Sequence, residues 1–373
     1  MMSNLIKKIG GGLALAMYSM LAQAEYALNL PTPVTEVARQ IHGLHTITMW
    51  IIVGIAVVVY GAMFYSILKH RKAAGHKAAN FHHNTMVEII WTTIPFIILI
   101  AMAYPATKTI IAMRDTAASD ITVKVTGYQW KWEYDYQQDG FKFMSVLSTP
   151  RDQLVNKEAK GEHYLLEVDN PMVVPVGKKV RILLTANDVL HAWWVPAFGV
   201  KQDAIPGFIK DSWFTAEKAG TYRGQCAELC GKDHGYMPIV VEVKEQADYD
   251  KWVAEQKAKS AAASQDSGKV FELAELKSMG EKVYAANCAG CHQAKGEGMP
   301  PVFPALDGSA IVKGPKQAVA HIVMEGKAGT SMPAFGKQLS DTDIAAVITF
   351  ARNSWKNQVG DAVQPSEIKA LRK

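Results

Sequence analysis

The sequence has a small net charge and few cysteines. The 373 residues include 40 Lys and Arg against 35 Asp and Glu, and a net charge of only +5 argues against a nucleic-acid partner. The four cysteines form two local pairs near histidines, Cys226 with Cys230 and Cys288 with Cys291. A disulfide framework is one interpretation of these pairs, but metal or cofactor binding explains both spacings better. The length leaves room for two or three structural units.

The N-terminus is typical of a secretory signal. Lys7 and Lys8 precede an apolar run over residues 10–21, which ends at Ala22-Gln23-Ala24. A basic region, a short apolar region and an A-x-A cleavage site in this order indicate a signal peptide. We therefore expect residues 1–24 to be removed and the mature chain to begin near Glu25.

Two apolar runs predict a transmembrane hairpin within residues 25–110. The first, at about 47–68, has no charged side chain, and the second, at about 86–106, is interrupted only by Glu88. Both are long enough to cross a bilayer. The basic loop between them, which begins KHRK at Lys69, is predicted to face the cytoplasm, so the rest of the chain lies outside. This topology fits the cytoplasmic (inner) membrane of a bacterium. Glu88 is either a carboxylate at the membrane edge or a proton-entry group.

The pattern changes between residues 111 and 245 to short runs rich in Val, Ile, Tyr and Trp. Four of them read as strands, namely Ile121–Val125, Tyr164–Val168, Val180–Leu184 and Ile239–Val243. Short strands separated by Gly, Pro and Asn predict an antiparallel sandwich or barrel, and we assign a β-sandwich.

A set of soft metal ligands stands near the end of this domain. Cys226, Cys230, His234 and Met237 share one short run, and His191 precedes it by one strand. Zinc would accept two Cys and two His, but its structural motifs usually have shorter Cys spacing and seldom use Met. Thiolate, imidazole and a weak Met ligand are typical of a copper electron-transfer centre. Copper is thus favoured over zinc or a loop disulfide.

The second cysteine pair belongs to Cys288-Ala289-Gly290-Cys291-His292, which matches the C-x-x-C-H motif for covalent haem attachment. In this motif both thiols bond the haem and the histidine binds its iron. Helices predicted at 276–287, 316–325 and 341–353 complete an all-α haem domain over residues 269–373. Its distal ligand is predicted to be Met332, because Met299 is too near His292 and Met324 falls on a helix, where core packing explains it. Residues 355–373 are polar and receive no role.

Between these domains, residues 246–268 predict a short helix, 246–257, followed by a flexible linker. The linker reads AKSAAASQDSG, a small and polar composition without apolar periodicity.

The copper run, CAELCGKDHGYM at residues 226–237, resembles the binuclear CuA motif of subunit II of the haem–copper cytochrome c oxidases. The similarity extends from about Thr35 to Val243 and includes EIIWTTIP at 88–95, YQWKWEY at 128–134, LEVDN at 166–170 and DAIPG at 203–207. The C-terminal domain is similar to class I cytochromes c, whose M-P-x-F loop matches Met332-Pro333-Ala334-Phe335. The resemblance implies a cupredoxin-like fold for the copper domain.

The resemblance also implies a role for each matching residue. Cys226 and Cys230 would bridge two coppers, His191 and His234 would each bind one, and Met237 would be a weak axial ligand. Glu228 would offer copper its carbonyl and would hold Mg²⁺ or Mn²⁺ with its carboxylate. Trp130 would admit electrons and Glu88 would lie on a proton pathway. Related quinol oxidases lack the copper ligands, so that alternative is disfavoured.

We therefore expect an electron-entry subunit of an oxygen-reducing, proton-translocating oxidase, with CuA and haem c on board and no oxygen-reducing site of its own. Its expected partners are the catalytic subunit I, subunit III, a donor cytochrome c or another redox protein, and the lipid bilayer, without nucleic acid. The alternatives are the CuA subunit of a nitric oxide reductase and a copper-handling membrane protein. A storage protein would need neither Trp130 nor the haem domain.

Overall fold

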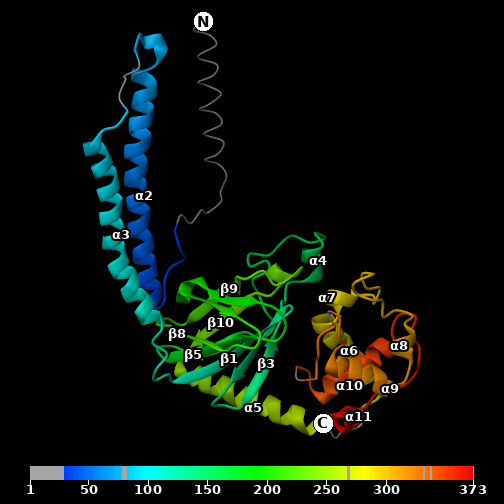
Figure 1. Ribbon diagram of the computed structural model, residues 1–373. Helices are drawn as coiled ribbons and strands as arrows, with labels where there is room; N and C mark the ends of the chain where they lie inside the picture. The colour runs from blue at the N-terminus through cyan, green and yellow to red at the C-terminus, as the bar shows by residue number, and fades with distance from the viewer. Residues whose placement is uncertain (1–28, 78–81, 267–268, 331, 337, 373) are drawn as a thin grey trace.

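The computed structural model describes residues 29–77, 82–266, 269–330, 332–336 and 338–372. The predicted signal peptide, residues 1–24, lies outside the described residues. A long helical hairpin stands on a β-domain, and a small helical domain lies beside that β-domain (Figure 1). These parts agree with the predicted hairpin, β-sandwich and all-α domain.

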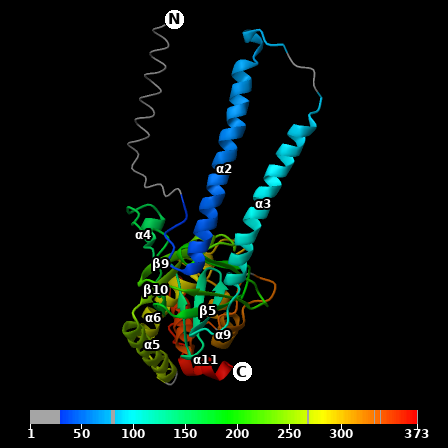
Figure 2. The ribbon, with the colours of Figure 1, turned by 90° about the vertical axis from the view of Figure 1, so that its left-hand side faces the viewer.

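The hairpin consists of α2 (Glu36–Lys69) and α3 (Thr85–Met113), both long and apolar enough to cross a membrane. Figure 2 shows both helices running away from the β-domain. α2 begins well before the predicted span because its first turn is anchored on the β-domain. The Thr35 hydroxyl accepts from the amide of Ala38 at 3.0 Å and donates to the Phe198 carbonyl at 2.8 Å. Arg39 also donates to both carboxylate oxygens of Glu217.

Two five-stranded sheets form the β-domain, in the orders β3-β2-β1-β5-β8 and β4-β10-β9-β6-β7. The large buried side chains, Trp132, Trp193 and Phe214 among them, come from both sheets and form one core between them. The strands are β1 Ile121–Tyr128, β2 Lys131–Tyr136, β3 Phe141–Ser145, β4 Met172–Pro175, β5 Lys179–Ala186, β6 His191–Val195, β7 Val200–Ala204, β8 Lys210–Thr215, β9 Gly220–Cys226 and β10 Ile239–Lys244.

The predicted β-sandwich is confirmed, with two corrections. The sheets are mixed rather than antiparallel, because β1 pairs in parallel with β5, and β10 with β4. The strand predicted over residues 164–168 is wrong. Leu165 has a φ of 62°, in the left-handed region, and its amide binds the Thr149 hydroxyl, so the chain turns there. Only Val168 forms an isolated bridge, to Leu147.

The linker prediction also needs correction. α5 (Gln246–Asp266) continues through most of the stretch expected to be flexible, because alanine, lysine and glutamine favour helix. Its first half is fixed to the β-domain through Trp252, whose ring meets those of Tyr136 and Phe141 at 5.2 and 5.5 Å between centroids. An anchored helix therefore separates the two outer domains.

The C-terminal domain contains α6 (Leu273–Asn287), α7 (Ala289–His292), α8 (Ala310–Lys313), α9 (Lys316–Glu325), α10 (Asp341–Arg352) and α11 (Pro365–Leu371). The three helices predicted there are confirmed. α6 and α10 cross in close contact at Gly280, where an added Cβ would lie only 2.0 Å from the Ala346 carbonyl oxygen. Glycine is required at this crossing.

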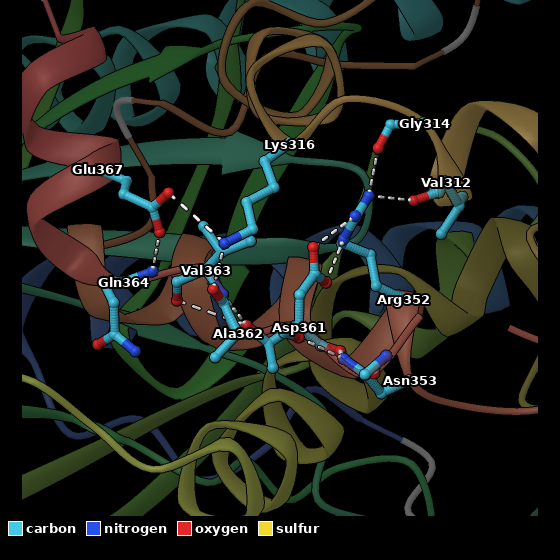
Figure 3. A network of polar contacts seen from close by, with 12 residues as sticks. Val312, Gly314, Lys316, Arg352, Asn353, Asp361, Ala362, Val363, Gln364 and Glu367 are labelled. Atoms are coloured by element: carbon cyan, nitrogen blue, oxygen red, sulfur yellow. Dashed lines mark hydrogen bonds and ion pairs between the residues drawn. The ribbon is translucent and has the colours of Figure 1, made fainter. Parts of the chain in front are cut away.

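The C-terminal segment, for which the sequence indicated no role, folds back on this domain. Figure 3 shows the network of polar contacts that holds this segment on the domain, in which the Arg352 guanidinium takes part. Arg352 donates to both carboxylate oxygens of Asp361 and to the carbonyls of Val312 and Gly314, at 2.6–2.8 Å. The segment is thus part of the domain rather than a loose tail.

Candidate redox centres

Soft ligands gather where β6, β9 and the loop before β10 meet. His191 begins β6 and Cys226 ends β9, while Cys230 follows on the loop. The two Sγ atoms lie 3.8 Å apart, and His191 Nδ1 lies 3.9 Å from Cys226 Sγ. His234, in the short turn η3 (His234–Tyr236), brings its Nδ1 to 3.4 Å from Cys230 Sγ.

Two further donors face the same cysteines. Met237 Sδ lies 3.5 Å from Cys230 Sγ, and the Glu228 carbonyl oxygen lies 3.3 Å from Cys226 Sγ. The structure therefore brings together all six atoms that the sequence predicted as copper ligands. We call His191, Cys226, Cys230, His234 and Met237 the thiol cluster. The Glu228 side chain is half-buried.

The donor set of the thiol cluster fits copper. An Sγ–Sγ separation of 3.8 Å is far beyond the disulfide bond length of about 2.05 Å, so the cysteines are free to bind metal. A thioether beside two thiols and two imidazoles matches soft copper ligation better than a structural zinc site. The two sulfurs are suitably placed to be shared between two metal ions.

Contacts within the thiol cluster also shift the pKa values of two of its side chains. A hydrogen bond between the thiols, assisted by His191, lowers the pKa of Cys226. Burial opposes protonation of His191, but the Asp188 carboxylate and Cys226 together raise the pKa of the imidazole. A thiol held readily as thiolate is the form that binds metal.

Asp188 is a functional residue that the sequence reasoning missed. Its carboxylate accepts from His191 Nε2 at 2.9 Å and from the backbone amide of Gln129 at 2.7 Å. This bond fixes the imidazole so that Nδ1 faces the cysteines, as an outer partner of a metal ligand does. Its position three residues before His191 was the available signal.

Replacing Asp188 by alanine is expected to lower copper affinity about 10–100-fold, because His191 loses the group that orients it. Copper per chain after a timed chelator challenge is the measurement. The exposed Asp152 of α4 (Arg151–Leu154) gives a matched control in Asp152→Ala, which should retain copper like the unsubstituted protein. If Asp188→Ala retained as much copper as the unsubstituted protein, Asp188 would have no role in copper binding.

Trp130, predicted to admit electrons, lies against the thiol cluster. Its Nε1 donates to the Cys230 carbonyl oxygen at 3.2 Å, and Gln129 Nε2 donates to the same oxygen at 2.8 Å. The indole is half-buried. Trp130 is thus one hydrogen bond away from a predicted copper ligand.

The haem motif, Cys288, Cys291 and His292, lies on and just before α7. His292 is buried, and its Nδ1 donates to the Pro304 carbonyl at 2.9 Å, which leaves Nε2 for a metal. Burial lowers the pKa of His292 and favours the neutral imidazole that binds iron. Cys288 and Cys291 belong to the C-terminal helical domain and are not part of the thiol cluster of the β-domain.

Met332 lies on the loop between α9 and α10, where its amide binds the Thr330 hydroxyl and its carbonyl accepts from Lys327. Met324 packs against the domain core, and the backbone of Met299 pairs with that of Phe303, as expected of methionines with structural roles. The distal role of Met332 stays a prediction. Glu88 lies exposed in the first turn of α3, on the hairpin.

Known proteins resemble the chain along most of its length. The family model described as cytochrome C oxidase subunit II, transmembrane domain, matches residues 23–109, and the one described as its periplasmic domain matches residues 121–244. A third model, cytochrome C oxidase, cbb3-type, subunit III, matches residues 276–350.

Relatives give the same result. The probable cytochrome c oxidase subunit 2 of Rickettsia bellii is 36% identical over 271 residues, covering 71% of this chain and 97% of that protein. Cytochrome c oxidase subunit 2 of Cereibacter sphaeroides is 39% identical, covering 58% of this chain and 76% of that protein. A crystal structure of the periplasmic domain of subunit II of the Bradyrhizobium japonicum cytochrome oxidase is 45% identical, with a TM-score of 0.35, and covers 38% of this chain and 96% of that one.

Proposed function

The chain belongs to the cytochrome c oxidase subunit II family, and on that premise we propose that the thiol cluster holds the binuclear copper centre CuA. Cys226 and Cys230 would hold the two metal ions together, His191 and His234 would each bind one, and Met237 with the Glu228 carbonyl would complete the set. The convergence of three side chains and one carbonyl on the two cysteine sulfurs supports these roles.

Family membership gives the broader function. The chain is the electron-entry subunit of a haem–copper oxidase, and it combines two transmembrane helices, a periplasmic-type copper domain and a cytochrome c domain. It works with other oxidase subunits and a cytochrome c donor. This identity favours oxygen reduction by the complex over the nitric oxide reductase and copper-handling alternatives.

Copper and haem supply one-electron redox chemistry, and the protein's own residues arrange it. Asp188 orients His191, and the Pro304 carbonyl orients His292, so each imidazole presents its free nitrogen to a metal. Trp130 lies on the Cys230 carbonyl. Electrons would accordingly pass from the domain bearing His292, by way of Trp130, to the domain bearing Cys230, and then to the catalytic subunit.

Finer assignments complete the proposal. Cys288 and Cys291 would attach the haem, and Met332 would bind its iron on the side away from His292. The Glu228 carboxylate holds Mg²⁺ or Mn²⁺ against catalytic subunit I, and Glu88 lies at the entrance of a proton pathway, with subunit III in the same complex. The membrane is the bacterial cytoplasmic membrane, with both redox domains on its outer side.

A haem-free variant, Cys288→Ala with Cys291→Ala, tests the order of transfer. We expect copper reduction by the native donor to slow about 100-fold or more, because the tethered donor provides a high effective concentration. Met332→Ala should lower the haem potential, since a His/Met pair raises it. Stopped-flow spectroscopy measures the rate of copper reduction, with reduction by a small chemical reductant as the control, and a redox titration of the haem absorption measures the potential. Unchanged copper reduction from the native donor would contradict this order.

A further inference from the structure

The haem domain makes specific contacts with the copper domain beside Trp130. Lys131, next to Trp130 at the start of β2, donates from Nζ to Asn287 Oδ1 at 2.5 Å. Lys232, on the loop between Cys230 and His234, donates from Nζ to the Gly290 carbonyl. Each acceptor is close in sequence to the haem motif, since Asn287 precedes Cys288 and Gly290 precedes Cys291.

Each lysine also lies over an aromatic ring of the haem domain. Lys131 Nζ is 5.1 Å from the centre of the Phe335 ring, and Lys232 Nζ is 5.8 Å from that of Phe303. Lys232 Nζ is also 5.8 Å from the centre of the Trp130 ring. An ammonium over an aromatic face is attracted to it, more strongly when water is excluded. Two lysines from one domain thus bind matching pairs of partners on the other.

The burial of Lys131 shows that the contact excludes water. The residue is only 3% exposed, and a fully buried lysine is rare without a partner. Burial lowers the pKa of Lys131 to about 8, so its charged form depends on the acceptor from Asn287 and on nearby carboxylates such as Glu133. Removing Asn287 Oδ1 would leave a buried ammonium short of an acceptor.

The rest of the interface is less tightly packed. A crevice of about 830 Å³ lies between the two domains and is lined from both sides, by Glu133, Asp169 and Asn170 on one and by Lys282, Asn287 and Arg372 on the other. Figure 1 shows the haem domain lying beside the β-domain. Apolar side chains such as Phe143, Val283 and Leu339 line the crevice as well, and an incompletely filled interface of this kind is typical of domains that associate reversibly.

We propose that Lys131 and Lys232 form a docking clamp that holds the haem motif against Trp130 and the Cys230 loop. The two lysines are positioning residues. They act by setting the fraction of time that the haem domain is docked on the copper domain. While it is docked, the haem domain of the same chain covers one side of Trp130. The benefit for electron transfer rests on the proposed function, whereas the clamp itself is a property of the protein surface.

Acetylation of Lys131 in the purified oxidase complex measures the clamp directly. Because Lys131 is buried, it reacts with a water-soluble acetylating ester only when the domains separate, and mass spectrometry gives its rate. Asn287→Ala should raise this rate about tenfold or more, the effect of losing one hydrogen bond to a charged group. Asn287→Asp should lower it, because an ion pair replaces the amide contact.

Three controls make the result specific. The exposed Lys210 on β8 should react at one rate in every variant, and Glu281→Ala, on the exposed face of α6, should leave Lys131 unchanged. Lys232→Met breaks the clamp from the copper-domain side and should also speed Lys131 acetylation. If the haem absorption spectrum shows that Asn287→Ala has lost its haem, Lys232→Met is the variant that tests the clamp.

The proposal is overturned if Lys131 reacts as fast as Lys210 in the unsubstituted complex. It is also overturned if haem-loaded Asn287→Ala and Lys232→Met leave the Lys131 rate unchanged. Photoreduction of haem in the same samples separates this result from the proposed function. Absence of haem-to-copper transfer in the unsubstituted complex would refute the proposed function, while the acetylation rates would still decide the clamp.

Discussion

Replacing Cys230 by serine is expected to abolish electron entry into the oxidase while leaving the haem attached. Cys230 Sγ has three neighbours in the thiol cluster, with Cys226 Sγ at 3.8 Å, His234 Nδ1 at 3.4 Å and Met237 Sδ at 3.5 Å. A serine oxygen is a hard ligand that copper does not favour in such a site. Because loss of an outer partner already costs 10–100-fold in metal affinity, loss of a bridging ligand should cost at least about 100-fold.

Copper per chain and oxygen consumption with the reduced native donor are the two measurements. Both should fall to background in Cys230→Ser, while the haem stays reducible by the donor. Leu229→Ser places the same new side chain on the same loop, at a position that is 77% exposed in the isolated chain, and should retain its copper. Full copper content with undiminished oxygen consumption in Cys230→Ser would refute the assignment of the thiol cluster.

Replacing Arg352 by methionine should destabilise the haem domain by about 3–5 kcal/mol, the usual effect of breaking a buried ion pair from one side. The Arg352 side chain is 3% exposed, and its loss leaves Asp361 and two backbone carbonyls without their donor. The guanidinium also holds the pKa of Asp361 below its usual range. The network of Figure 3 would therefore lose the contacts that Arg352 makes in it.

Thermal unfolding, followed through the haem absorption of the purified complex, measures this effect. Lys356→Met is the matched control, because Lys356 pairs with Asp307 through a side chain that is 82% exposed and such pairs contribute about 0–1 kcal/mol. Adding Asp361→Leu to Arg352→Met should recover part of the loss, since no buried charge is then left unpaired. An unfolding temperature equal to that of the control would contradict a structural role for residues 355–372.

The parts predicted from sequence were those encoded over short distances. Cys288, Cys291 and His292 lie within one turn of chain, so their spacing alone carries the haem motif. The apolar runs of the hairpin and the helices around the haem motif follow from local composition and periodicity. The run from Cys226 to Met237 was found in the same way and His191 was predicted with it, and the fold brings His191 from another strand to the two cysteines.

The parts that were missed depend on tertiary contacts. Asp188 lies three residues before His191, but its role becomes clear only when the fold brings its carboxylate to the His191 ring and to the Gln129 amide. Nothing in the local sequence around Lys131 indicates that it is buried, because its acceptor, Asn287, comes from the other outer domain. The parallel pairing of β1 with β5 is likewise decided by which strands meet in space.

The two wrong local predictions have simple causes. Residues 164–168 have the composition of a strand, but the positive φ of Leu165 and its bond to Thr149 favour a turn. Residues 258–266 have the small, polar composition of a linker, yet their alanines extend a helix that Trp252 has already anchored on the β-domain. The bond to Thr149 overrides local composition in the first case, whereas helix propensity and tertiary anchoring act together in the second.

Time-resolved photoreduction of haem in the intact oxidase complex tests whether electrons pass from haem to copper within one chain. Haem reoxidation and copper reduction should then occur with the same first-order rate, independent of protein concentration, because donor and acceptor belong to one chain. A rate that rises with protein concentration, or haem reoxidation without copper reduction, would contradict it.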